Sequence, residues 1–145
     1  MKIIKLLPFL SLCTFTYMAC QGNENETITL KETVWKLVSF VNVANNEIKE
    51  PQPISEKCYL LTFNEGNTLT GFSSSNELVG TYILNNKNLS IHINIHQATL
   101  VTEAFDGNPY LEALNTAQSF LLHGDELQLY YNDKKNYLLF KLQKS

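Results

Sequence analysis

The stretch FNEGNTLTGFSSSNELVGTYILNNKNLSI (residues 63–91) decides the fold of this 145-residue chain. It alternates short apolar runs with turns made of Gly and Asn, the residues that best tolerate a positive φ. Residues 68–72, 78–84 and 89–95 are predicted strands. Because every connection between them is short, we expect these strands to be antiparallel neighbours in one sheet.

Strands are also predicted on both sides of this stretch, because the flanking runs are rich in β-branched and aromatic residues. They cover residues 34–41, 59–63, 119–123, 126–131 and 137–142. The only Trp of the chain, Trp35, lies near the start of the first of these strands, and we expect it to fill the core. The segment 42–57 holds two Pro, several Asn and several charges, which predicts a long exposed loop.

One short helix interrupts the strand pattern. Apolar residues recur at helical spacing from Tyr110 to Ala117, after the sequence Asp106-Gly107-Asn108-Pro109. Asn108 is the predicted N-cap, and Pro109 suits the first helical position. The predicted fold class is therefore α+β, predominantly antiparallel β, with a curled sheet or partial barrel packed on one short helix.

The N-terminus has the layout of an export signal. Two lysines precede the apolar run of residues 6–19, which is shorter than the roughly 20 residues that a spanning helix needs. The run ends in Tyr-Met-Ala followed by Cys20, which resembles a bacterial lipobox. We therefore interpret residues 1–19 as a lipoprotein signal peptide and Cys20 as the lipidated residue. An ordinary signal peptide followed by a chance cysteine is the alternative.

Residues 20–32 are short and mostly polar, and we interpret them as a lipid-anchored flexible tether before a folded domain of residues 33–143. The acyl chains on Cys20 would supply the membrane affinity. The predicted location is the cell envelope, at the outer membrane, on its periplasmic or its surface-exposed side.

Charge and cysteine content exclude several classes of function. The net charge is −3, and all 11 basic residues are Lys. The chain thus lacks the planar guanidinium that dominates base and phosphate recognition, and we expect no nucleic-acid binding. Once the signal peptide is removed and Cys20 is modified, Cys58 has no thiol left to pair with. Cys58 is expected to be a small buried hydrophobe.

The order of motifs carries a family resemblance. A strand with Trp and a long loop precede the pattern F-x-x-x-x-x-L-x-G-x-x-S-x-N-x-x-x-G-x-Y, which is followed by T-x-x-x-E and a short helix. The positions that we call the fold signature are Trp35, Gly71, Ser74, Asn76, Gly80 and Tyr82. Their order and spacing resemble the META (HslJ-like) domain family over residues 34–142. The resemblance implies a small β-rich domain, often secreted or lipid-anchored, with no general catalytic activity.

The signature residues have physical interpretations as well. Gly71 and Gly80 suit places where the backbone bends or packs closely on another strand. The side chain of Asn76 can cap a bend, and Tyr82 can fill the core while its hydroxyl finds a polar partner. Members of the family carry Cys where this chain has Ser75 and Glu103, so no property of those thiols carries over.

No catalytic constellation or metal motif is present in the sequence. His92 and His96 share a strand face but lie roughly 13 Å apart at about 3.3 Å per residue, too far to bind one metal ion. The isoleucines between them are expected to face inward. Glu103 and Asp106 are interpreted as residues that frame the helix start. We therefore predict no enzyme activity, no metal and no cofactor.

The leading functional hypothesis is a non-enzymatic envelope lipoprotein that acts as a binding or structural module. Its expected partners are the membrane, through the lipid on Cys20, and an envelope protein. The alternative is an inhibitor or sensor of an envelope protease or lysozyme that acts through the loop of residues 42–57. The candidate contact residues in that loop are Asn45, Asn46, Glu47, Lys49 and Glu50. A carrier of a small apolar ligand is disfavoured, because Phe and Tyr would fill the sheet's interior.

Overall fold

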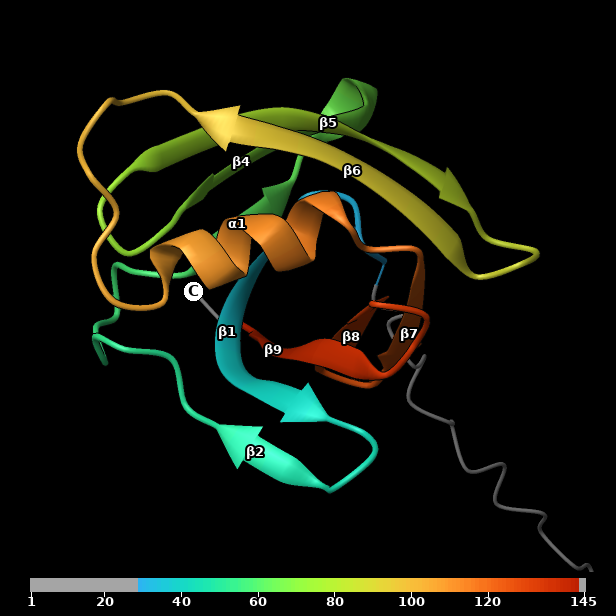
Figure 1. Cartoon of the computed structure of the whole chain (residues 1–145). Helices are drawn as coiled ribbons and strands as arrows, with labels where there is room; N and C mark the ends of the chain where they lie inside the picture. Colours follow the sequence, from blue (N-terminus) through green and yellow to red (C-terminus); the bar gives the residue numbers. More distant parts are fainter. Residues whose placement is uncertain (1–28, 144–145) are drawn as a thin grey trace, which may run out of the picture.

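Antiparallel strands dominate residues 29–143, the part of the chain that the computed structural model describes (Figure 1). One α-helix and one short 3-10 helix interrupt them. In chain order the elements are β1 (Thr33–Asn42), β2 (Glu47–Lys49), β3 (Leu60–Phe63), η1 (Glu65–Asn67), β4 (Thr68–Phe72), β5 (Glu77–Asn85), β6 (Ser90–Gln97), α1 (Gly107–Asn115), β7 (Ser119–His123), β8 (Glu126–Tyr131) and β9 (Asn136–Leu142).

All of the strands except β2 close into a barrel. They pair in the order β1, β3, β4, β5, β6, β7, β8, β9, and β9 pairs back to β1 from Trp35↔Leu142 to Asn42↔Asn136. The predicted mostly antiparallel fold with one short helix is confirmed, but the sheet is more than curled or partly closed. Closure occurs because β1 bonds to β3 along one edge, from Thr33 to Lys36, and to β9 along the other, from Trp35 to Asn42.

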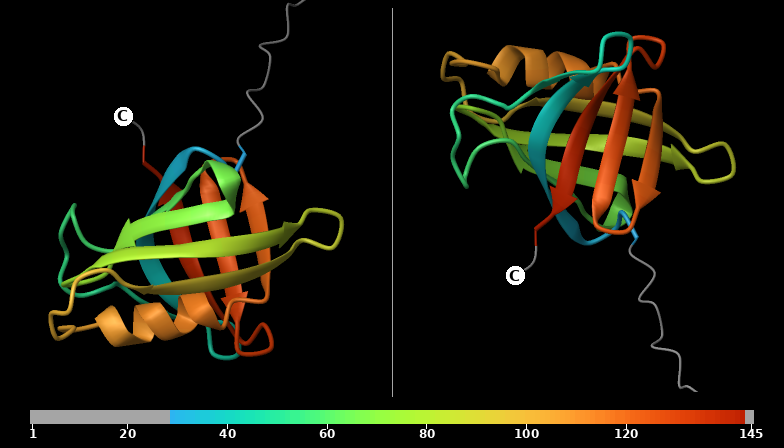
Figure 2. Two further views of the ribbon diagram at one scale, coloured as in Figure 1. Left: turned by 90° about the horizontal axis from the view of Figure 1, so that it is seen from above. Right: turned by 90° about the horizontal axis from the view of Figure 1, so that it is seen from below.

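The barrel strands form two groups that cross each other, as both views in Figure 2 show. β4, β5 and β6 form one side, β7, β8, β9 and β1 form the other, and β3 lies between β1 and β4. The side chains between the two groups make the core. Trp35, Tyr59 and Phe140 are fully buried there, and Phe63 packs edge-on against Tyr82 with 5.0 Å between ring centroids.

Strand β6 shows how the sequence pattern orients a strand. Ile91, Ile93 and Ile95 are buried, whereas His92 and His96 are exposed, so the predicted inward direction of the isoleucines is confirmed. Strict alternation of apolar and polar residues has this effect because successive side chains in a strand point to opposite faces.

The shortest strand pairing of the barrel is that of β6 with β7, which pair only at Ser90↔Ser119. Beyond this pair, α1 takes the place of a neighbouring strand. The Asn115 side chain accepts a hydrogen bond from Ile95 N (2.8 Å) and donates one to Ile95 O (3.0 Å). Asn115 thereby satisfies a backbone that β7 does not reach, and the buried residues Tyr110 and Leu114 of α1 join the core.

The helix begins and ends earlier than the sequence predicts. Asp106 occupies the N-cap position, so the prediction of Asn108 as the cap is wrong, and α1 ends at Asn115. Contacts with a segment that is distant in the sequence determine where the helix starts. The Asp106 carboxylate bonds to Lys49 and to Gln52 N rather than to the helix's own N–H groups. Asn108, one residue inside the helix, is exposed.

The predicted loop of residues 42–57 is more ordered than expected. It contains β2, which pairs with the far end of β1 from Phe40↔Lys49 to Asn42↔Glu47 and projects from the barrel (Figure 1). The sequence did not predict this strand, because only three residues form it and all three are exposed. The predicted exposure of this segment is confirmed for residues 43–50, but the prediction of a loop is wrong where β2 forms.

Candidate functional site

A partly buried carboxylate collects four of the chain's polar side chains at one end of the barrel. Glu103 Oε1 accepts hydrogen bonds from Asn76 Nδ2 (2.7 Å), from Gln97 Nε2 (2.9 Å) and from Ser73 Oγ. Glu103 Oε2 accepts one from Ser74 Oγ (2.6 Å). We call these five residues the Glu103 network. It ties the bend between β4 and β5 to the crossover of residues 98–106 that leads into α1.

Electrostatics keep Glu103 ionised. Burial favours the neutral acid, but the hydrogen bonds from Ser73, Ser74, Asn76 and Gln97 outweigh burial and hold the pKa of Glu103 below its usual value. A carboxylate whose oxygens already accept four side-chain hydrogen bonds acts as an anchor for the surrounding chain. The interpretation of Glu103 as a residue that frames the helix start missed this network.

Asn76, a signature residue, also binds the crossover. Its Oδ1 accepts from Thr99 Oγ1 (2.9 Å) and from Val101 N (2.9 Å), while its Nδ2 donates to Val101 O (2.7 Å). The bend itself is capped by Ser73, whose Oγ accepts from Asn76 N (3.0 Å). The prediction that the Asn76 side chain caps its own bend is therefore wrong: the amide is fully buried and bonds to a distant segment.

The remaining signature residues lie in the barrel wall and core. Added Cβ atoms at Gly71 and Gly80 would collide with the carbonyl oxygens of Leu60 and Asn94, so both glycines allow close approach of a neighbouring strand. Trp35 is fully buried, and its indole N–H donates to a threonine hydroxyl. Tyr82 is buried as well, but its hydroxyl bonds to none of the described residues, so the polar partner expected for it is absent.

Two loops from distant parts of the sequence meet at this end of the barrel. The segments 50–57 and 98–106 lie side by side in Figures 1 and 2. Asp106 joins them, because its carboxylate accepts from Gln52 N (2.9 Å) and its own N–H donates to Gln52 O (3.2 Å). The Tyr59 hydroxyl donates to the same Gln52 carbonyl. We call these two segments the joined-loop end.

The joined-loop end exposes large apolar side chains. Leu100 is 94% exposed, Ile54 75%, Phe105 72% and Val101 57%. The charged residues between 98 and 106 are Glu103, which is held in its network, and Asp106, which is buried. Single exposed apolar residues are common, but here four of them lie on two loops that partly buried polar bonds hold together.

Of the candidate loop residues from the sequence, Glu50 belongs to the joined-loop end and Lys49 contacts it through Asp106. Asn45, Asn46, Glu47, Lys49 and Glu50 are all exposed, and most of them belong to the β1–β2 hairpin. The Asn45 side chain bonds to Glu47, and Lys49 forms an ion pair with Asp106. Sequence reasoning chose the polar residues and missed Ile54, because an isoleucine in a sequence is normally expected to be buried.

The described residues offer neither a metal centre nor a membrane-spanning helix. Within residues 29–143, no three His, Cys, Asp or Glu side chains are grouped so that they could hold a metal ion. Over the same range, the structure has no helix with both the length and the apolar character needed to cross a membrane. Cys20, the predicted lipidation site, lies outside the described residues.

The family model of the META domain matches residues 26–144. The chain belongs to the META domain family. This META domain resembles the crystal structure of a DUF4847 family protein from Bacteroides vulgatus, with a TM-score of 0.62 and 21% identity over 79% of this chain and 94% of the other. It also resembles the NMR structure of a protein from Burkholderia xenovorans, with a TM-score of 0.62 and 19% identity over 80% and 85% of the two chains. At such identities the likeness concerns the fold alone. A comparison with curated proteins found no match.

Proposed function

We propose that this META domain is a non-enzymatic binding module of the cell envelope, anchored by lipid on Cys20, and that it binds a protein partner through the joined-loop end. One observation carries the proposal. Ile54, Leu100, Val101 and Phe105 are exposed on two loops that the Glu103 network and Asp106 hold in place. Rigid loops with exposed apolar side chains lose little conformational entropy when a partner covers them.

The charges at the joined-loop end favour a protein over a membrane surface. Its exposed charged residues are Glu50, Glu56 and Lys57, which sum to −1. Surfaces that lie on anionic bilayers are rich in Lys and Arg, whereas protein interfaces combine an apolar centre with a polar rim. The lipid on Cys20 would hold the domain at the membrane and leave the joined-loop end available to another protein.

The partner test uses photo-crosslinking from defined positions. A photoreactive phenylalanine replaces Phe105 in one variant and Ile83 in a control, since Ile83 is 69% exposed on β5, away from the crossover. We expect an envelope protein to crosslink from position 105 alone. Its purified form should bind the Leu100→Ser/Phe105→Ser variant at least tenfold more weakly than the wild type. Equal crosslinking from both positions, or unchanged affinity, would contradict the proposal.

The second candidate is an inhibitor or sensor of an envelope protease or lysozyme. The observation that favours it is the pinning of the 50–57 loop at Gln52, since a preorganised loop is what a tight inhibitor presents. If the crosslinked protein is such an enzyme, adding the purified META domain should lower its turnover. Turnover that stays constant at saturating META domain would leave a binder without inhibitory action.

The anchor is tested separately by labelling cells with a fatty acid. Labelled acyl chains should appear on the wild-type chain and vanish from the Cys20→Ala variant. Cys58→Ala is the control and should keep the label, because Cys58 is buried in the folded domain. Persistent labelling of Cys20→Ala would refute lipid attachment at Cys20 without bearing on the partner surface.

A further inference from the structure

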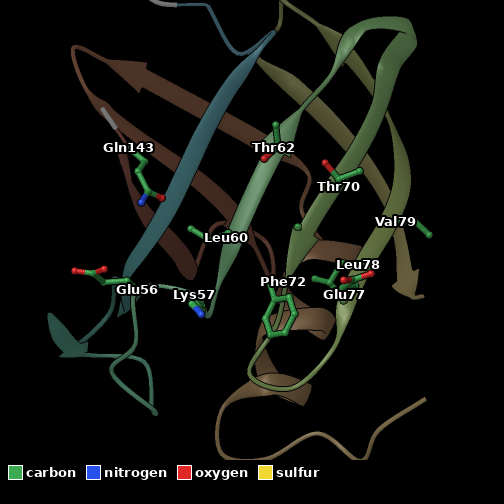
Figure 3. A pocket seen from close by; sticks show the side chains of 11 residues that line it. Glu56, Lys57, Leu60, Thr62, Thr70, Phe72, Glu77, Leu78, Val79 and Gln143 are labelled. Atoms are coloured by element: carbon green, nitrogen blue, oxygen red, sulfur yellow. The ribbon is translucent and has the colours of Figure 1, made fainter. Parts of the chain in front are cut away.

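A groove of about 600 Å³ runs over the outer face of β3, β4 and β5 (Figure 3). Two cross-strand pairs form its floor: Leu60↔Phe72, which is apolar, and Thr62↔Thr70, which carries hydroxyls. Their side chains point outward because the alternate residues of these strands face the core. The floor therefore has an apolar end with an aromatic ring and a polar end.

The rim of the groove adds hydrogen-bonding groups of both kinds. Glu56 and Lys57 come from the loop before β3, Glu77 pairs across from Phe72, and Gln143 follows β9. None of these four side chains makes a hydrogen bond or an ion pair with another residue of the range 29–143. Carboxylates accept, the ammonium donates, and the amide and hydroxyls do both.

The backbone of the groove is already paired. β3 lies between β1 and β4, and β4 lies between β3 and β5. An extended peptide therefore cannot be added as another strand, which is the usual way in which a sheet binds a peptide. The groove presents side chains alone to its occupant.

Charge and shape narrow the class of ligand further. The charged residues Glu56, Lys57 and Glu77 sum to −1, so a phosphate or another polyanion would be repelled. The groove is an open trough on the outside of the barrel, so it does not enclose an acyl chain. A suitable ligand is neutral, has an apolar face for Phe72 and carries many hydroxyls at its edges.

We infer that this groove binds a short neutral oligosaccharide. A pyranose ring has C–H groups on its face that can pack on the Phe72 ring, because the negative aromatic face attracts them. Its equatorial hydroxyls can both donate and accept, and so they match the mixed rim of Lys57, Glu77 and Gln143. Outer sheet faces of small barrels also bind oligosaccharides in the OB-fold. This site shares only Glu56 and Lys57 with the joined-loop end and does not depend on the protein partner.

The test presents the purified full chain, in a detergent without sugar groups, to an immobilised panel of neutral and acidic oligosaccharides. We expect one or more neutral members to be retained. For the strongest of them, Phe72→Ala should weaken binding at least tenfold, whereas Phe72→Tyr should keep it. Ile83→Ala is the matched control, because Ile83 is exposed on the same sheet but does not line the groove.

A second variant guards against misfolding of Phe72→Ala. The Glu77 side chain is exposed and makes no hydrogen bond or ion pair within residues 29–143, so Glu77→Gln should fold normally and weaken binding several-fold. Retention of acidic members alone, or of none, would overturn the inference. So would a neutral ligand whose affinity is unchanged in both Glu77→Gln and a folded Phe72→Ala.

Discussion

Asn76 Nδ2 donates a 2.7 Å hydrogen bond to Glu103 Oε1 across 27 residues of the chain. The same amide bonds to both backbone groups of Val101, next to the fully solvated Leu100. The bond thus couples two separate parts of the family pattern, the bend between β4 and β5 and the T-x-x-x-E segment of the crossover. A hydrogen bond in the interior of the domain thus fixes the position of apolar side chains on its surface.

The Glu103 network makes stability depend on pH. The pKa of Glu103 is lowered in the folded state, so the unfolded chain takes up the proton first as the pH falls below about 4.3. The free energy of unfolding should therefore decrease below that pH. The part that ionised Glu103 contributes is fully lost once the pH lies below the folded-state pKa of Glu103. Glu103→Gln should remove this part of the decrease. Urea titrations between pH 7 and pH 3 measure it.

The control for this measurement is Glu65→Gln, because Glu65 is exposed in η1. That variant should follow the wild-type pH dependence. Parallel curves for wild type and Glu103→Gln would show that protonation of Glu103 does not contribute to acid destabilisation.

Gly80 should not tolerate a side chain. A Cβ there would collide with Asn94 O and press on the Cα of Ile95, both on the paired strand β6. Gly80→Ala should lower the free energy of unfolding by about 1–3 kcal/mol, the usual cost of overpacking. Thr81→Ala, at an exposed position on the same strand, should change it by less than about 1 kcal/mol. Thermal unfolding followed by circular dichroism compares the two variants, and equal midpoints would contradict the prediction.

Asp106 should hold the 50–57 loop in place. Its carboxylate accepts a hydrogen bond from the backbone N–H of Gln52, with an N···O distance of 2.9 Å, so Asp106→Ala leaves that N–H without its partner. Hydrogen exchange at the Gln52 amide should become at least about tenfold faster, which corresponds to about 1.4 kcal/mol. The Asn64 amide, bonded to Thr68 O at 2.9 Å, is an internal control and should keep its rate. Unchanged exchange at Gln52 would mean that other contacts hold the loop.

Phe105 should be a position where stability and binding oppose each other. Its φ of 51° lies in the left-handed region, which costs an ordinary residue about 1–2 kcal/mol, and its side chain is 72% exposed. Phe105→Gly should raise the free energy of unfolding by roughly 0.5–1 kcal/mol, since the greater freedom of unfolded glycine offsets part of the relief. The same variant should weaken partner binding.

Leu100→Gly is the matched control for that prediction, because Leu100 is more exposed but has no positive φ. It should not stabilise the domain. Equal gains from both substitutions in urea unfolding would indicate an effect of glycine in general rather than relief at Phe105.

Local patterns were enough to predict most strands. In β6, for example, the alternation of isoleucines with polar residues determines which face of the strand is buried. The short hairpin turns were equally local. Barrel closure was not predictable, since it depends on the pairing of Trp35 with Leu142 from the opposite end of the domain. The Asn76–Glu103 bond was missed for the same reason: both residues were noted, but nothing local indicates that they meet.

Two further differences between the predicted and the observed structure have other physical causes. Asp106 and Asn108 both suit an N-cap, and the choice between them follows from the contact of Asp106 with Gln52, far away in the sequence. Ile54 lies in the segment predicted to be an exposed loop, but the exposure of Leu100 could not be recognised, because hydrophobicity alone predicts burial. The sequence thus contains the side chains of the joined-loop end but not the exposure of all of them.

The pairing of β1 with β9 also sets the order of events during synthesis. β1 is the first strand of the domain to leave the ribosome, and the strand that completes its second edge is the last. Closure therefore waits until β9 has been made, and contacts of such long range slow folding. A chain that ends before Asn136 would expose unpaired edges on β1 and β8, which are templates for aggregation. Newly made chains are thus most vulnerable just before their final strand arrives.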